Sequence, residues 1–174
     1  MQKDIIDKLA TRSFSLRKIT AEDAPLLAEF HTHLSERSKE LFTPHLFDLK
    51  SLQVVCERFA EEIYDSGFLV CAEDGRIAAY FFLWHINEDV PELGISVVDE
   101  YQGHGLGRLC MEYMIAEGKK LGKKQLRLTT GLDNDNAFHL YEKCGFVYKG
   151  IIEIPNGPGG KPFLQREMFY SYDN

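Results

Sequence analysis

The stretch that decides the fold runs from Pro91 to Gly107 and reads PELGISVVDEYQGHGLG. Residues 92–98 have the apolar pattern of a strand, and a helical pattern begins at residue 105. Glycines alternate between the two, at positions 103, 105 and 107. Such glycines let backbone N–H groups converge, and the following helix adds the positive end of its dipole. The segment therefore predicts a loop that binds a pyrophosphate.

Two other phosphate-binding loops fit this spacing poorly. A dinucleotide-binding loop has the pattern GxGxxG and an acidic residue about 20 positions later, where this chain has Lys124 and Gln125. A nucleoside-triphosphate loop needs Gly-Lys followed by Ser or Thr, whereas Gly107 is followed by Arg108 and Leu109. A tight turn without a ligand stays open for the glycines taken alone.

The residues before this stretch predict a strand, two helices and a hairpin. Residues 13–20 alternate as a strand, and helical spacing follows from about residue 21 and again over residues 52–63. Residues 68–72 and 76–86 are rich in β-formers and are joined by Asp74-Gly75, a strong hairpin signal. Gly94 is predicted to mark a bulge in the strand that comes next.

The residues after it predict a helix, a strand, a helix and two strands. These elements cover residues 105–121, 125–130, 134–144, 146–154 and 163–172, with the loop PNGPGGK before the last strand. We count the order βααββββαβαββ, plus or minus one strand. No repeat or linker interrupts it, so residues 1–174 are expected to form a single α+β domain with a mixed central sheet flanked by helices.

Composition narrows the class of protein. The 174 residues are 44% apolar, enough for a core without disulfides or metal, and the net charge of −7 disfavours a nucleic-acid surface. The four cysteines form no CxxC pair, which gives no sign of a metal site. The N-terminus lacks a secretory pattern and no stretch approaches 18 apolar residues. We expect a soluble, cytoplasmic protein that binds neither membrane nor nucleic acid.

The segment Glu92 to Gly107 closely resembles the acetyl-CoA-binding motif of the GNAT superfamily of N-acetyltransferases. The core of that motif, (Gln/Arg)-x-x-Gly-x-(Gly/Ala), is matched by Gln102, Gly105 and Gly107. Residues 134–146, which end in Gly-Phe, resemble the helix that follows in the family. The similarity is strong over about residues 90–150, whereas the first 60 residues match only in the order of their elements.

This resemblance implies a fold with a splayed strand pair at the acyl-CoA site, and it implies residue roles. Tyr141 corresponds to the tyrosine that protonates or hydrogen-bonds the coenzyme sulfur, and Asn136, with Asn134 as the alternative, to an asparagine that contacts pantetheine or the coenzyme backbone. Backbone groups of the strand before the loop would bind pantetheine and the thioester carbonyl, and the loop itself would bind pyrophosphate. These positions are Ile95, Ser96, Val97, Gln102, Gly103, His104, Gly105, Leu106 and Gly107.

The residues themselves leave alternatives open. Tyr141 shares a helical face with apolar residues and could be a core aromatic, and Asn136 could be a helix N-cap. Glu92 is the best candidate for a general base, directly or through water, with His85 as the alternative. Cys144 could suggest an acyl-cysteine, but no paired histidine is evident.

The leading hypothesis is therefore an acetyl-CoA-dependent N-acyltransferase, without a metal, that acetylates a primary amine of a small molecule or protein. The alternative is a coenzyme-A-binding sensor or regulatory module without turnover. A structural domain in an assembly would have no affinity for the coenzyme. Acceptor identity and oligomeric state stay open, a homodimer included.

Overall fold

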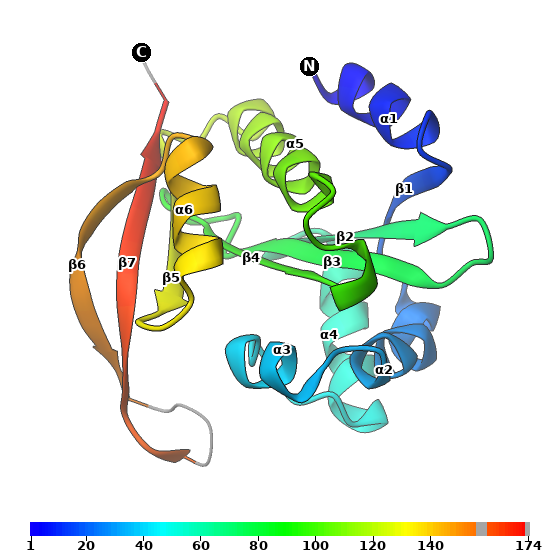
Figure 1. Cartoon of the computed structure of the whole chain (residues 1–174), viewed down its shortest axis with the longest axis horizontal. Coiled ribbons are helices and arrows are strands. Elements are labelled where there is room, and N and C mark those ends of the chain that lie inside the picture. The colour runs from blue at the N-terminus through cyan, green and yellow to red at the C-terminus, as the bar shows by residue number, and fades with distance from the viewer. Residues whose placement is uncertain (156–159, 173–174) are drawn as a thin grey trace.

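The computed structural model describes residues 1–155 and 160–172, and Figure 1 shows their arrangement. A seven-stranded mixed sheet has the order β1-β2-β3-β4-β5-β7-β6. Its strands are β1 Phe14–Lys18, β2 Asp65–Ala72, β3 Ile77–Trp84, β4 Glu92–Val97, β5 Gln125–Gly131, β6 Val147–Ile154 and β7 Phe163–Ser171. The α-helices are α1 Gln2–Ala10, α2 Ala24–Thr32, α3 Glu36–Leu41, α4 Leu49–Glu61, α5 Leu106–Lys120 and α6 Asp135–Lys143. Short 3₁₀ turns cover Ala21–Asp23 and Asp99–Tyr101.

Helices cover both faces of this sheet. Figure 1 shows α1 and α5 on one face and α2, α3 and α4 on the other. The first face carries a core with Phe68 and Phe81, and the second carries Leu69 and Tyr80. Strands buried on both faces are apolar at nearly every position, as β3 is and as β2 is from Phe68 onward, because neither set of side chains reaches water. The α+β class with a mixed sheet is confirmed.

The predicted hairpin is confirmed, and the number of strands lies within the margin of one strand given with the predicted order. β2 and β3 pair antiparallel around a turn in which Gly75 adopts φ +85°. The described residues form one strand fewer than the order βααββββαβαββ contains. The loop PNGPGGK falls partly on residues 156–159, outside the described range.

Three helices, rather than two, separate β1 from β2, and α1 precedes them. α3 has no buried residue and therefore no apolar periodicity to find. Its start is fixed by Ser35, whose hydroxyl accepts from the Ser38 N–H and donates to Asp99. α1 buries only Ile5 and Leu9, one turn apart against α5, too short a pattern to distinguish from chance. None of the helices in the described ranges is long and apolar enough to span a bilayer.

Candidate functional site

The two central strands of the sheet diverge. β4 and β5 run parallel and share one registered pair, Glu92 with Arg127, whereas β3 and β4 share six. The Arg127 N–H donates to the Pro91 carbonyl at 3.0 Å, so the strands meet at the start of β4 and separate beyond it. On its other edge β5 pairs with β7 along its whole length. The splayed strand pair is confirmed, and along residues 95–97 the edge of β4 that faces β5 has no registered partner there.

Gly94 does not produce this divergence, and the predicted bulge is wrong. The register between β3 and β4 is uninterrupted from Glu92 to Val97. The glycine is required by packing instead, because a Cβ at this position would lie 2.2 Å from Cζ of Phe82. The ring of Phe82 therefore occupies the space that a side chain on β4 would fill.

The glycine loop has the geometry of an anion-binding turn. Gly103 and Gly105 adopt φ of +76° and +80°, a region that other residues rarely adopt. Gly105 is the N-cap of α5 and supplies no side-chain cap, so the first N–H groups of the helix have no side-chain acceptor there. Gly107 is small for another reason: a Cβ would lie 3.3 Å from the Leu140 side chain. The cradle fits a pyrophosphate.

Other predicted coenzyme residues lie around this loop. The Gln102 Nε2 amide donates to the Val97 carbonyl at 2.9 Å and so ties the loop to the end of β4. His104 is exposed, and its carbonyl accepts from Arg12 at 2.8 Å. Leu106 is buried in the core. Ser96, in β4, is also buried. The structure thus brings β4, the loop and the start of α5 together.

The N-cap of α6 is Asn134 and not Asn136. The Asn134 Oδ1 accepts from the Ala137 N–H at 3.3 Å, while Asn136 lies exposed in the first turn. The capping role considered for Asn136 is therefore wrong. Its side chain is exposed, and its assignment to the coenzyme stays a prediction.

Tyr141 is a residue of α6, and its side chain is buried in the core. Its side chain is 8% exposed and packs near the ring of Phe146. Burial raises the pKa of Tyr141 well above its usual value, so the hydroxyl keeps its proton. Burial also raises the pKa of the Cys144 thiol, the opposite of what a nucleophilic cysteine needs. Direct transfer is therefore better supported than an acyl-cysteine.

Glu92 lies on the opposite face of the sheet from Tyr141. It is paired across the strands with Trp84, which packs on the α2–α4 side, whereas Tyr141 belongs to the core beside α5. Its Oε2 accepts from Nη1 of Arg127 at 2.7 Å, and Glu167 binds Nε of the same guanidinium at 2.7 Å. The carboxylate is therefore an ion-paired group at the closed end of the gap.

His85 directly follows Trp84, the cross-strand partner of Glu92. It follows β3 in a left-handed conformation, φ +59°, and its backbone N–H donates to Asp65. Its imidazole is exposed and lies 3.8 Å from the Glu88 carboxylate. The structure therefore places it nearer to solvent than Glu92.

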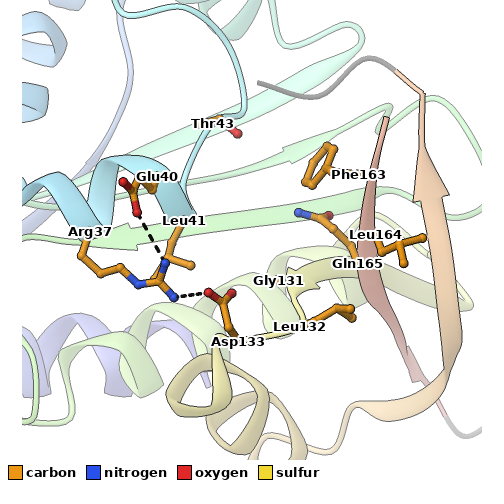
Figure 2. Close-up of a pocket in the computed structure, with 10 residues that line it drawn as sticks. All are labelled: Arg37, Glu40, Leu41, Thr43, Gly131, Leu132, Asp133, Phe163, Leu164 and Gln165. Atoms are coloured by element: carbon orange, nitrogen blue, oxygen red, sulfur yellow. Dashed lines mark hydrogen bonds and ion pairs between the residues drawn. The ribbon is translucent and has the colours of Figure 1, made fainter. Parts of the chain in front are cut away.

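A cavity of about 470 Å³ opens between α3, the end of β5 and the start of β7, as Figure 2 shows. Arg37 reaches across it from α3, and its Nη2 lies 2.5 Å from the Asp133 carboxylate. This contact holds the pKa of Asp133 below its usual value. Glu40 lies 3.5 Å from the same guanidinium. Sequence reasoning missed this cluster because 96 residues separate Arg37 from Asp133.

An aromatic cluster anchors the connection between α3 and α4, which continues from the cavity-lining residue Leu41. Phe42 follows the cavity residue Leu41 and packs edge-on against Tyr80 at 5.9 Å between ring centroids. The Tyr80 hydroxyl donates to Nε2 of His45 at 2.9 Å, because Nδ1 of that ring faces the Leu46 carbonyl. Burial lowers the pKa of His45 and keeps it neutral. These contacts fix the α3–α4 connection on β3.

Within residues 1–155 and 160–172, no cluster of three or more His, Cys, Asp or Glu side chains could hold a metal ion. The basic residues at the end of α5 are exposed, as expected of cations at a helix C-terminus.

Comparison with known proteins gives one family. The model of the Acetyltransferase (GNAT) family matches residues 27–146. The ribosomal protein bS18-alanine N-acetyltransferase of Escherichia coli K12 is 34% identical over 74 residues, 42% of this chain and 50% of that protein. The uncharacterized N-acetyltransferase YvbK of Bacillus subtilis is 28% identical over 108 residues, 61% of this chain and 70% of that protein. The chain thus spans about half the length of the first relative.

A solved structure extends the likeness to nearly the whole chain. The ribosomal-protein-S5-alanine acetyltransferase from Vibrio fischeri superposes with a TM-score of 0.76, covering 93% of this chain and 94% of that one. The sequence identity is 17%, so this similarity shows the fold alone.

Proposed function

Because this chain belongs to the GNAT family of acetyltransferases, we propose that it transfers the acetyl group of acetyl-CoA directly to a primary amine. The observation that carries the proposal is the gap between β4 and β5, because the glycine loop follows the end of β4 and the Arg37–Asp133 cavity lies at the end of β5. Two substrates can meet in such a gap from opposite faces of the sheet.

The coenzyme is assigned to the α5–α6 side. Backbone N–H groups at the start of α5 and in residues 102–107 would hold the pyrophosphate, since the loop conformation and the helix dipole both favour an anion there. Residues 95–97 would supply backbone groups to pantetheine and the thioester carbonyl, since this part of β4 has no registered partner in β5. Asn136 would add a side-chain contact at the exposed start of α6.

The reaction needs a free amine and a protonated leaving group. The amine nitrogen attacks the thioester carbon, a C–N bond forms, and the C–S bond breaks as the tetrahedral intermediate collapses. Glu92, acting through water, takes a proton from the amine on the acceptor side. Tyr141 donates its proton to the departing sulfur on the coenzyme side; burial keeps its hydroxyl protonated and thus available as a hydrogen-bond donor before the C–S bond breaks. His85 and bulk water remain alternative routes for the amine proton.

Replacing Glu92 by Gln is expected to lower kcat/KM at neutral pH by about tenfold, less than the usual effect of losing a general base because water can replace it. The defect should fade as the pH rises through the pKa of the acceptor amine, since solvent then supplies the free amine. Initial rates between pH 7 and 10 measure both effects.

Glu167→Gln is the matched control, because Glu167 binds the same guanidinium at the same distance of 2.7 Å. The Glu167→Gln substitution should change the stability of the fold and leave kcat/KM and its pH dependence nearly unaltered. If both variants lose the same activity, the role of Glu92 is to hold Arg127 and not to accept a proton.

The acceptor is assigned to the cavity on the α3 side. Its wall includes the carboxylates of Glu40 and Asp133, which suit an approaching ammonium group, together with apolar surface from Leu132 and Phe163. The relative in Escherichia coli is named for the alanine of a ribosomal protein, which makes a protein N-terminus one candidate. Small amines are the other candidate class. Measuring the release of the coenzyme thiol with a panel of acceptors from both classes distinguishes the two.

Acetyl-CoA is expected to raise the melting temperature of the protein. A ligand at about 100 times its dissociation constant stabilises the folded state by roughly 2.7 kcal/mol. NADH should produce no comparable shift, because the loop departs from the dinucleotide pattern. Equal shifts, or none, would contradict the proposed coenzyme site. Binding without thiol release across the panel would instead indicate a coenzyme-binding module without turnover.

A further inference from the structure

We propose that Arg12 is a positioning residue for the coenzyme, which it serves by holding the glycine loop in its binding conformation. This inference rests on the proposed function, since it assigns the loop to the pyrophosphate. Arg12 lies outside the span of residues 27–146 that the family model matches, and it reaches the loop across 92 positions of sequence.

The contact controls the direction of one peptide group. Nη1 of Arg12 donates to the His104 carbonyl at 2.8 Å. The carbonyl and the following N–H point to opposite sides of a trans peptide, so this bond turns the Gly105 N–H away from the guanidinium. Nη1 of Arg12 lies 3.6 Å from the position that a Cβ of Gly105 would occupy. The N–H is thereby directed to the face where the anion would bind.

The loop needs such a constraint. Glycine has more conformational freedom than any other residue, and both Gly103 and Gly105 adopt left-handed conformations. Packing beneath the loop is incomplete, because a cavity of about 260 Å³ lies there, lined by Arg12, Phe14, Tyr101, His104 and Leu106. A side-chain hydrogen bond therefore supplies order that close packing does not.

Arg12 is itself held from both sides along the chain. It lies two residues after the end of α1, whose Ile5 and Leu9 are buried, and the Gln2 amide donates to the Glu117 carboxylate of α5 at 2.6 Å. On its other side Ser13 adopts φ +62°, a conformation that persists only where the surroundings enforce it. α1 is thus docked on the helix that begins at the loop, and Arg12 is presented to that loop from a fixed position.

The test compares ligands that contain the pyrophosphate with ligands that lack it. For Arg12→Ala we expect the Kd of coenzyme A, measured by calorimetry, to rise about tenfold, the effect of losing one charge-assisted hydrogen bond. The affinity for pantetheine, which lacks the pyrophosphate, and kcat at saturating acetyl-CoA should stay within about twofold. Arg12→Lys, which keeps a donor and the charge, should recover part of the affinity.

Lys8→Ala is the matched control for lost charge, because Lys8 is an exposed cation on α1 one turn before Arg12. It should leave both affinities unchanged. The inference is overturned if Arg12→Ala binds coenzyme A as the wild type does, if Lys8→Ala weakens it equally, or if pantetheine binding falls in parallel. Failure of the wild-type protein to bind coenzyme A would instead overturn the proposed function.

Discussion

Gly105→Val is expected to weaken acetyl-CoA binding by about a hundredfold or more. A β-branched residue cannot adopt φ +80° without strain, so the loop must rearrange and withdraw backbone donors from the phosphate. Hydrogen bonds to charged groups contribute about 1.5–3 kcal/mol each, and the loss of two corresponds to at least two orders of magnitude in Kd. Calorimetric titration of the folded variant measures the change.

Gly122→Val provides the control for strain. Gly122 adopts φ +71° just after α5, with no atom within 4 Å of its added Cβ, so the backbone penalty is of the same kind. It lies one helix length from the loop, about 22 Å for 15 residues. Both variants should lose stability, but only Gly105→Val should lose the coenzyme. Equal affinity in the two variants would reduce Gly105 to an ordinary turn residue.

Tyr141→Phe is expected to lower kcat by about 10² to 10⁴, the range typical of a lost general acid, with coenzyme affinity little changed. The substitution keeps the ring in the core and removes only the hydroxyl. Because a thiolate is already a competent leaving group, we expect the lower end of that range. Acyl donors whose thiols are more acidic should show a smaller defect. Single-turnover rates with saturating acetyl-CoA isolate the chemical step.

Tyr113→Phe is the matched control for burial. Both tyrosines are 8% exposed in the same core, and burial raises the pKa of each. Tyr113 extends from α5 toward Phe68 in β2 and Phe81 in β3. Its substitution should preserve turnover. If Tyr141→Phe is as active as this control, Tyr141 is a packing residue and water protonates the thiolate.

Glu92 and Tyr141 lie on opposite faces of the sheet, so their variants are expected to respond to different substrates. A coenzyme bound on the α5 side and an acceptor bound on the α3 side would each meet a different proton-transfer group. Variants of Tyr141 should therefore respond to the acidity of the leaving thiol, and variants of Glu92 to the pKa of the amine. The two dependences can be measured independently on the same protein.

The sequence by itself determined the local units. The strand, the glycine loop and α5 were predictable because hydrophobic periodicity and left-handed glycines act within a few residues. The hairpin at Asp74-Gly75 and the helix before Gly145 were predictable for the same reason. A helix such as α3, which buries no residue, carries no such signal and was missed.

Only the tertiary structure decided how these units meet. Glu92 proved to be the ion-pair partner of Arg127, 35 residues away, and Arg37 to span a cavity to Asp133. Gly94 proved to leave room for the ring of Phe82 and does not form a bulge. Each of these facts is a contact between side chains on different elements, whose positions depend on the packing of the whole sheet. Local sequence carries no record of them, because its preferences act on backbone conformation and burial and not on which distant partner comes within hydrogen-bonding distance.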